Sequence, residues 1–266
     1  MKSQFGICRV SIAPIRAEAS DRSEIYTQLL FGDAFEIIES LEKWMRIRTL
    51  YDTYEGWIDP KQAIHISAEE FKKWPDQKWI IGLDRLPRAI KPNGEPIYLV
   101  PGCTLPNFEN NQFNFGGETY QFEGQAILPE PGKFAAELEK VSLFYLNSPY
   151  LWGGRTPWGI DCSGLTQLVY KHFGMRILRD AAQQATQGET VDFLTAAKPG
   201  DLAFFDNAEG RIIHVGILLG QDRIIHASGR VKIDPIDHQG IYSEELGKHS
   251  HKLRIIKRFS QIPVYR

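Results

Sequence analysis

The sequence predicts an α+β domain, in which helices pack on an antiparallel sheet, preceded by one or two small all-β barrels. The first 66 residues contain short apolar or alternating segments separated by polar and glycine turns, a pattern typical of strands. Helical spacing of apolar residues begins only after residue 133, and strand-length segments follow it towards the C-terminal end. We therefore divide the chain into residues 1–66, 67–128 and 129–266.

The first division carries strand patterns at residues 7–12, 34–39 and 44–48 and ends with Gly56-Trp57-Ile58. Its glycine is expected to let the backbone bend before a buried aromatic residue. Several short strands at this spacing predict a small barrel. The segments WMRI at 44–47 and GWI at 56–58 resemble the repeats of bacterial SH3-like domains.

Residues 67–128 are rich in proline, glycine and asparagine, with short strand patterns at 97–100, 113–115 and 119–122. This division is interpreted as a second, diverged SH3-like module. The alternative is an irregular insertion packed on the first barrel.

Residues 129–132, Pro-Glu-Pro-Gly, interrupt any regular element and mark a boundary. The following segment predicts a helix whose buried face consists of Phe134, Leu138, Val141 and Tyr145. A second helix is predicted after Asp161, and strands are predicted at 201–205, 214–219, 223–227 and 253–258.

Composition argues against several classes of protein. The 266 residues are 42% hydrophobic and 24% charged, which suits a buried core with an ordinary polar surface. A net charge of −2 argues against nucleic-acid binding, and no segment approaches the ~20 apolar residues of a membrane-spanning helix. Because the first residues lack a secretory signal, we expect a cytoplasmic protein, or a periplasmic or secreted one if a signal was removed.

The three cysteines, Cys8, Cys103 and Cys162, are too few and too far apart for a disulfide framework or a CxxC site. Cys8 and Cys103 are expected to be small hydrophobic residues that are buried or half-buried. Cys162 differs because Asp161 precedes it as a helix N-cap, which places the thiol in the first turn. The helix dipole there favours the thiolate, the reactive form.

Two histidines support a nucleophilic role for Cys162. His214 and His226 lie in apolar strand patterns joined by Gly220-Gln221-Asp222, a turn of hairpin length. Adjacent antiparallel strands would bring the two imidazoles together on one face, with His214 as base and His226 as its orienting partner. A zinc site made of Cys162, His214, His226 and perhaps Asp161 is the alternative, but no ligand pair has the close spacing of structural zinc sites. We therefore expect no metal or other cofactor.

Several motifs occur in the order seen in NlpC-type cell-wall peptidases. They are YLWGG at 150–154, DCSG at 161–164, KPGDLAFF at 198–205, HVGI at 214–217 and IHA at 225–227. The resemblance spans about residues 130–260 and implies a papain-like domain that cleaves the γ-D-glutamyl–diamino acid bond of peptidoglycan stem peptides. Carried over by position, it implies Cys162 as nucleophile, His214 as base, His226 as orienting residue and Tyr150 as a group that stabilises the oxyanion.

SH3-like modules ahead of the peptidase domain resemble the recycling subgroup, whose members require a free N-terminal alanine. This resemblance implies an ammonium pocket to which Asp161, Ser163, Glu24 and Tyr54 contribute. Glu18, Glu36 and Tyr51 are neighbours of similar chemistry. Arg179 stands in an R-D-A segment where the family often has R-D-S, so it is interpreted either as a substrate contact or, preferably, as a structural ion-pair partner.

The function predicted is hydrolysis of a free murein tripeptide or a similar peptidoglycan-derived peptide. One alternative is a secreted wall-remodelling endopeptidase that acts on intact peptidoglycan. The other is a non-catalytic wall-binding protein with a decayed peptidase domain, although the intact cysteine and histidine set argues against decay.

Overall fold

The structure of this protein is a computed structural model that describes residues 4–259. It divides the chain into two compact units, the first ending at Pro129 and the second beginning at Glu130. The division falls within the Pro-Glu-Pro-Gly segment. Each unit is described separately below.

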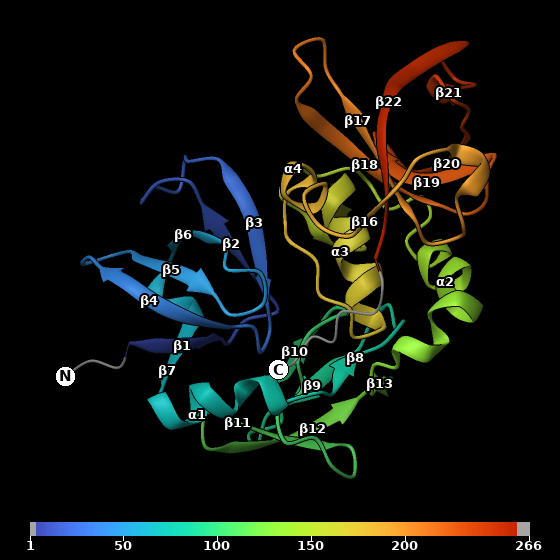
Figure 1. Cartoon of the computed structure of the whole chain (residues 1–266). Coiled ribbons are helices and arrows are strands. Elements are labelled where there is room, and N and C mark those ends of the chain that lie inside the picture. The colour runs from blue at the N-terminus through green and yellow to red at the C-terminus, as the bar shows by residue number, and fades with distance from the viewer. Residues whose placement is uncertain (1–3, 260–266) are drawn as a thin grey trace. The chain divides into compact units, whose positions relative to one another are not determined.

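The N-terminal part of the first unit is a seven-stranded antiparallel sheet with the order β3-β2-β6-β5-β4-β1-β7 (Figure 1). Its strands are β1 (Phe5–Cys8), β2 (Ile12–Arg16), β3 (Ile25–Leu30), β4 (Ala34–Ser40), β5 (Met45–Thr49), β6 (Glu55–Ile58) and β7 (Ala63–Ile66). Alternate residues of β5 are buried, as the sequence pattern predicts. They join a core that contains Cys8, Ile15, Phe35, Met45, Ile47 and Ile58.

The glycine of the GWI segment has a different role from the one expected. Trp57 is only half-buried, so the glycine does not precede a buried aromatic residue. A Cβ atom on Gly56 would lie 2.5 Å from Cγ2 of Ile15 and 2.7 Å from the carbonyl oxygen of Arg16. The absence of a side chain therefore allows β6 to lie closely against β2.

The rest of the first unit contains a four-stranded sheet and a separate two-stranded ladder. The sheet has the order β10 (Pro96–Tyr98), β9 (Arg88–Ile90), β12 (Glu118–Glu123), β11 (Gln112–Phe115), and the ladder pairs β8 (Ile80–Ile81) with β13 (Ala126–Ile127). Helix α1 (Ala68–Lys73) precedes these strands. It begins with a capping box between Ser67 and Glu70 and has no buried residue. Phe31 of the first barrel packs against Phe113 and Phe115, which joins the two parts of the unit.

The second unit has the predicted α+β architecture, with helices packed on an antiparallel sheet. The main sheet has the order β16 (Glu189–Val191), β22 (Lys248–Arg258), β17 (Leu202–Asp206), β18 (Ile212–Leu218), β19 (Arg223–Ser228), β20 (Arg230–Pro235), and β21 (Gly240–Ser243) pairs with β22. The remaining elements are α2 (Phe134–Leu143), α3 (Cys162–His172), α4 (Ala181–Gln184), β14 (Arg155–Thr156) and β15 (Gly159–Ile160). Short 3-10 helices lie at Pro60–Gln62, Trp74–Asp76, Pro131–Lys133 and Leu194–Ala196.

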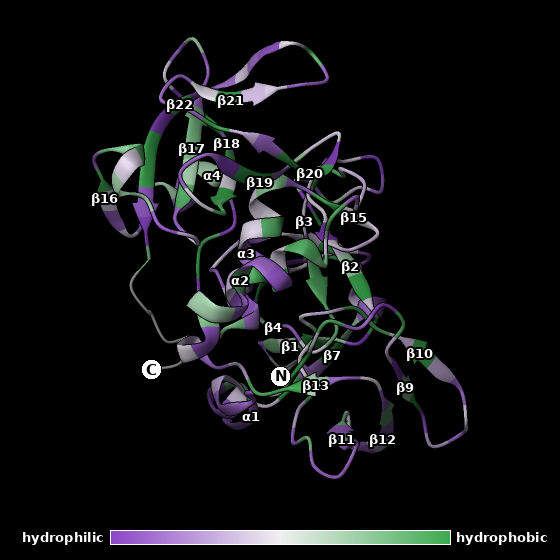
Figure 2. Ribbon diagram, turned by 90° about the vertical axis from the view of Figure 1, so that its right-hand side faces the viewer, coloured by the Kyte–Doolittle hydropathy of each residue, from purple (hydrophilic) through white to green (hydrophobic). Residues whose placement is uncertain are grey.

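Helix α3 is the centre of this unit and packs against β18 and β19. Every residue from Cys162 to Lys171 is buried, so the helix has no solvent-exposed face until its last residue. Strands β17 and β18 are coloured mainly as hydrophobic in Figure 2, whereas α1 of the first unit is hydrophilic. Among residues 4–259, no helix is long and apolar enough to cross a membrane.

Candidate active site

Helix α3 begins at Cys162, and Asp161 is its N-cap. The Asp161 carboxylate accepts a hydrogen bond of 2.6 Å from the Gly164 backbone N–H and one of 2.8 Å from that of Gly153. A Cβ atom on Gly164 would lie 2.3 Å from the carbonyl oxygen of Gly154. The two glycine-containing motifs, YLWGG and DCSG, therefore pack directly against each other and fix the position of the thiol-bearing turn.

Arg179 forms a buried ion pair with Asp161. Its guanidinium donates to both carboxylate oxygens, at 2.6 and 3.0 Å, and at 2.8 Å to the Ser163 hydroxyl. The side chains of Arg179 and Asp161 are 1% and 7% exposed. This is the structural ion pair preferred from the sequence, and the substrate-binding roles suggested for Asp161, Ser163 and Arg179 stay predictions.

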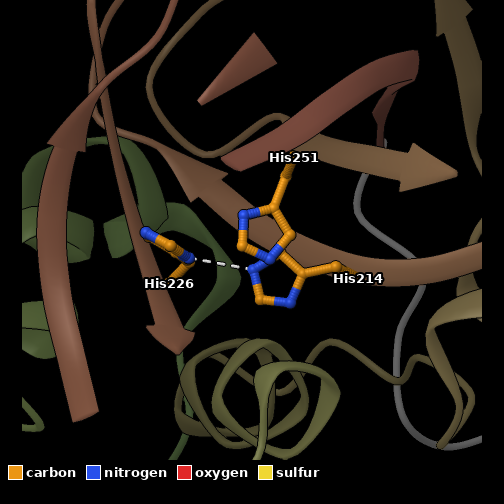
Figure 3. A group of neighbouring side chains, drawn as sticks. All are labelled: His214, His226 and His251. Atoms are coloured by element: carbon orange, nitrogen blue, oxygen red, sulfur yellow. Dashed lines mark hydrogen bonds between the residues drawn. The ribbon is translucent and has the colours of Figure 1, made fainter. Parts of the chain in front are cut away.

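His214 and His226 lie on neighbouring strands, β18 and β19, and their rings are hydrogen-bonded, as Figure 3 shows. The distance between Nε2 of His214 and Nδ1 of His226 is 2.9 Å. Nε2 of His226 lies 3.1 Å from Oδ2 of Asp234 on β20, and the same carboxylate oxygen lies 3.3 Å from Nζ of Lys232. The result is a chain of polar groups across three strands, in which Asp234 holds the orientation of His226 and His226 holds that of His214.

Sequence analysis did not identify Asp234 or His251. Asp234 lies two residues after Lys232, which pairs directly with His226, so all three lie on one face of the sheet. Side chains alternate between the two faces of a sheet, so this pattern along the strand after His226 could have identified Asp234 from the sequence. His251 is supplied by β22, and no local pattern connects it with β18 because 36 residues separate it from His214.

The ring of His251 stacks on the ring of His214, with a centroid separation of 4.2 Å and an interplanar angle of 25°. Burial lowers the pKa of His214 well below its usual value, and the neighbouring His226 and His251 lower it further. Burial also lowers the pKa of His251 to about 4. Both rings are therefore neutral at neutral pH.

Cys162 lies against β18, where its sulfur faces the backbone of the residue that follows His214. The backbone N–H of Val215, the residue after His214, faces the sulfur atom and lowers the thiol pKa, as does the N–H of Ser163. Burial and the Asp161 carboxylate have the larger, opposite effect and raise the pKa of Cys162 to about 12. The expectation that the start of the helix makes this thiol ionise readily is therefore wrong for the substrate-free protein, because Cys162 is only 7% exposed.

Tyr150 is half-buried and lies close enough to Cys162 and Asp161 for their charges to affect it. Burial, reinforced by these two groups, raises the pKa of Tyr150 to about 12. Its phenol is therefore protonated at neutral pH and can donate a hydrogen bond. This is the protonation state that its predicted role requires.

The first unit contains the other two predicted substrate-binding residues. Glu24 is exposed and lies immediately before β3, whereas Tyr54 is half-buried and lies immediately before β6. The rings of Tyr26 and Tyr54 are in edge-on contact at 6.2 Å, which brings these two strand starts together. Among the neighbours of similar chemistry, Glu36 is ion-paired with Arg48 at 3.2 Å.

The remaining cysteines have no place in the site. Cys8 and Cys103 are both fully buried, as expected, and neither forms a disulfide; burial raises the pKa of Cys8 strongly. The zinc alternative joined Cys162 to His214 and His226. Among the described residues, the nitrogen atoms close enough to share an ion belong instead to His214, His226 and His251, and they lie within 4.8 Å of one another.

Comparison with known proteins identifies relatives of both units. A family model described as the NlpC/P60 family matches residues 147–249, and one described as the bacterial dipeptidyl-peptidase SH3 domain matches residues 15–62. A protein named dipeptidyl-peptidase 6 from Lysinibacillus sphaericus is 29% identical over 261 residues, which cover 88% of this chain and 93% of the relative. A γ-D-glutamyl-L-lysine dipeptidyl-peptidase from Bacillus subtilis is 32% identical over 219 residues, which cover 76% of this chain and 72% of the relative.

Solved structures share the fold. An NlpC/P60 family protein from Bacillus cereus superposes with a TM-score of 0.79 at 19% identity, over 96% of this chain and 99% of that one. An NlpC/P60 endopeptidase from Photobacterium damselae gives a TM-score of 0.70 at 18% identity, over 95% of this chain and 70% of that one.

Proposed function

This chain belongs to the NlpC/P60 family of cysteine peptidases, and we propose that it hydrolyses the γ-D-glutamyl–diamino acid bond of a peptidoglycan-derived peptide. The observation that carries the proposal is the placement of Cys162 at the start of α3, against the backbone of the residue that follows His214. A nucleophile next to a base that is itself oriented by a third group is the requirement for acyl transfer.

The proposed reaction begins when His214 accepts the thiol proton of Cys162 and the sulfur attacks the γ-carbonyl carbon. The resulting oxyanion accepts hydrogen bonds from the Tyr150 phenol and the Cys162 backbone N–H; such a donor typically contributes ~3 kcal/mol in the transition state. His214 then gives its proton to the leaving amine, and a thioester remains. Water, deprotonated by the same imidazole, attacks the thioester and releases the acid and the thiol.

His226 and Asp234 act as positioning residues in this scheme. The 2.9 Å contact between His214 and His226 fixes the ring plane of the base, and the 3.1 Å contact with Asp234 fixes that of His226. When His214 becomes positively charged, the buried carboxylate of Asp234 offsets part of that charge.

We further propose that the substrate is a released peptide with a free N-terminal L-alanine. Relatives over most of this chain are named dipeptidyl-peptidases, and the first barrel matches an SH3 domain named for that activity. An enzyme that removes a dipeptide must recognise a free amine. Asp161 and Ser163, beside Cys162, are the candidates in the peptidase unit, and Glu24 and Tyr54 are the candidates within the first unit. A cytoplasmic location, which cell fractionation would test, suits a released substrate.

The test is product analysis by mass spectrometry on L-Ala-γ-D-Glu-diamino acid peptides with free and with N-acetylated termini. We expect the free peptide to yield L-Ala-D-Glu and the diamino acid, and acetylation to lower kcat/KM at least about 100-fold, because it removes the charge and hydrogen-bond donors of the ammonium that the site is proposed to recognise. Equal cleavage of both peptides would favour an endopeptidase that acts on intact peptidoglycan. A Cys162→Ala protein with full activity would exclude the catalytic proposal, and an inactive native chain would favour a wall-binding protein.

A further inference from the structure

The stacked position of His251 gives the site a third imidazole that acyl transfer does not require. Figure 3 shows the three rings close together, with that of His251 over that of His214, and one nitrogen atom of each ring lies within 4.8 Å of the others. We propose that His214, His226 and His251 form a binding site for a divalent transition-metal ion such as zinc, and that occupancy of this site reversibly stops hydrolysis.

The chemistry of the donors fits such an ion. Imidazole nitrogen suits Zn²⁺, Cu²⁺ and Ni²⁺, and three histidines are a ligand set that proteins use for zinc. Zinc holds imidazole nitrogen at ~2.0–2.1 Å, so ligand nitrogens on one ion lie about 3.3 Å apart. Nε2 of His214 and Nδ1 of His226 are already 2.9 Å apart, whereas the His251 ring is stacked on that of His214 and must turn out of the stack to direct its nitrogen at a shared ion.

The surroundings of the rings also match those of metal-binding histidines, whose second nitrogen is usually held by an acceptor. Nε2 of His226 lies 3.1 Å from the Asp234 carboxylate, and Nδ1 of His251 lies 2.8 Å from the Ser250 hydroxyl. Nδ1 of His226, now in contact with Nε2 of His214, and Nε2 of His251 are the nitrogens that would then bind the ion. The ring of Phe205, with its centroid 5.8 Å from that of His214, provides an apolar wall.

One member of the group, His251, borders a surface pocket. A pocket of about 670 Å³ is lined by His251 and by Ile213, which precedes the base in β18. His251 is the partly exposed member of the group, whereas His214 and His226 are buried. His251 is therefore the member of the group that an ion from solvent would meet first.

Inhibition follows from the electron pairs of imidazole, and this step rests on the proposed function. A neutral imidazole has one nitrogen with a free electron pair, and the other nitrogen carries a proton. An ion on His214 takes that pair and leaves a protonated nitrogen, so the ring cannot accept the proton of Cys162. Removal of the ion restores the base, with no covalent change.

The binding test uses the full chain with Cys162→Ser, so that no active-site thiolate can serve as a ligand. Cobalt chloride is titrated and followed by the visible d–d absorption of a tetrahedral site, and zinc chloride is then used to displace it. We expect one cobalt ion per chain. Adding His251→Gln should weaken binding at least about tenfold, since even loss of a residue that only supports a ligand costs ~10–100-fold.

The matched control is His249→Gln, which changes a histidine on the same strand and in the same pocket that is instead paired with Asp237 at 3.0 Å. It should leave cobalt affinity within about twofold of the parent. The proposal would be overturned if the Cys162→Ser protein binds no cobalt, or if adding His251→Gln leaves its cobalt affinity unchanged. Because His251→Gln could disturb folding, zinc-induced shifts of the histidine ring signals are also measured by NMR in the Cys162→Ser protein, and they should be confined to His214, His226 and His251.

Inhibition is measured separately, as the ratio of hydrolysis rates with and without zinc chloride in each protein. The native chain should lose activity over the zinc range that displaces cobalt and regain it with EDTA, and His251→Gln should need at least about tenfold more zinc. If the native chain and the His251→Gln variant lose activity at the same zinc concentrations, the proposal that the bound ion stops hydrolysis is contradicted. A chain that binds cobalt but hydrolyses no peptide would contradict the proposed function and leave the metal site standing.

Discussion

Replacing Arg179 with methionine should destabilise the peptidase unit strongly without exposing any new surface. The side chain of Arg179 is 1% exposed, and it accounts for two of the hydrogen bonds to the Asp161 carboxylate, at 2.6 and 3.0 Å. Methionine has a similar length and fills the space, but it leaves Asp161 as a buried carboxylate without its cation. Breaking a buried pair in this way costs about 3–5 kcal/mol.

That cost corresponds to a fall in Tm of roughly 10 °C, because 1 kcal/mol shifts Tm by about 2–4 °C for a unit of this size. Differential scanning calorimetry of the full chain would measure it. The matched control is Arg230→Met, which removes an ion pair with Glu245 in the same unit whose side chains are 47% and 57% exposed. An exposed pair contributes at most about 1 kcal/mol, so Tm should change little.

A second substitution separates loss of the charge pair from loss of packing. In the double variant Arg179→Met/Asp161→Asn the residue at the N-cap is neutral and can still accept the Gly164 backbone N–H. It should therefore regain most of the lost stability. If Arg179→Met lowers Tm no more than Arg230→Met does, or if the double variant is no more stable than the single one, the ion pair is not what holds the start of α3 in place.

Three further predictions concern ionisation and orientation. Because the pKa of the Cys162 thiol is raised to about 12, its alkylation by iodoacetamide should accelerate steadily above pH ~7; a rate plateau already reached near pH ~6 would contradict this. Burial lowers the pKa values of His172 and His251 to about 4, so the unfolded chain binds more protons and Tm should fall as the pH drops from about 6.5 towards 4; a constant Tm would contradict this. Asp234→Asn should lower kcat at least about tenfold and shift its pH profile, since His226 loses its carboxylate partner, and an unchanged profile would leave Asp234 with only a structural role.

The sequence was sufficient for the parts of the site that depend on local order. Asp161 before Cys162 predicts a capped helix start, and the Gly220-Gln221-Asp222 turn predicts adjacent strands for His214 and His226; the structure has both features. Each of these inferences depends on contacts within a hairpin or a helical turn. The α+β fold class was predictable for the same reason, because a helical pattern followed by successive strand patterns limits the topologies available.

Features that depend on distant contacts could not be predicted in this way. His251 reaches His214 only because β22 pairs with β17 and β17 pairs with β18, an order that no periodicity encodes. The thiol pKa was predicted with the wrong sign for a related reason. The position at a helix start is visible in the sequence, but the burial that outweighs it results from packing of α3 against β18 and β19, far along the chain.

The raised thiol pKa and the lowered imidazole pKa have a joint consequence for catalysis. Both result mainly from burial, which penalises an isolated charge on either group, so the substrate-free site favours a neutral thiol beside a neutral imidazole. Transfer of the proton creates two opposite charges at once, and these stabilise each other most when they are adjacent and water is excluded. In the proposed reaction, attack on the carbonyl then moves the negative charge to the oxyanion, near the protonated Tyr150, while the carboxylate of Asp234 offsets the charge on the imidazolium. Reactivity at this site therefore depends on a substrate being present to accept the charge, which also protects an otherwise oxidisable thiol in its absence.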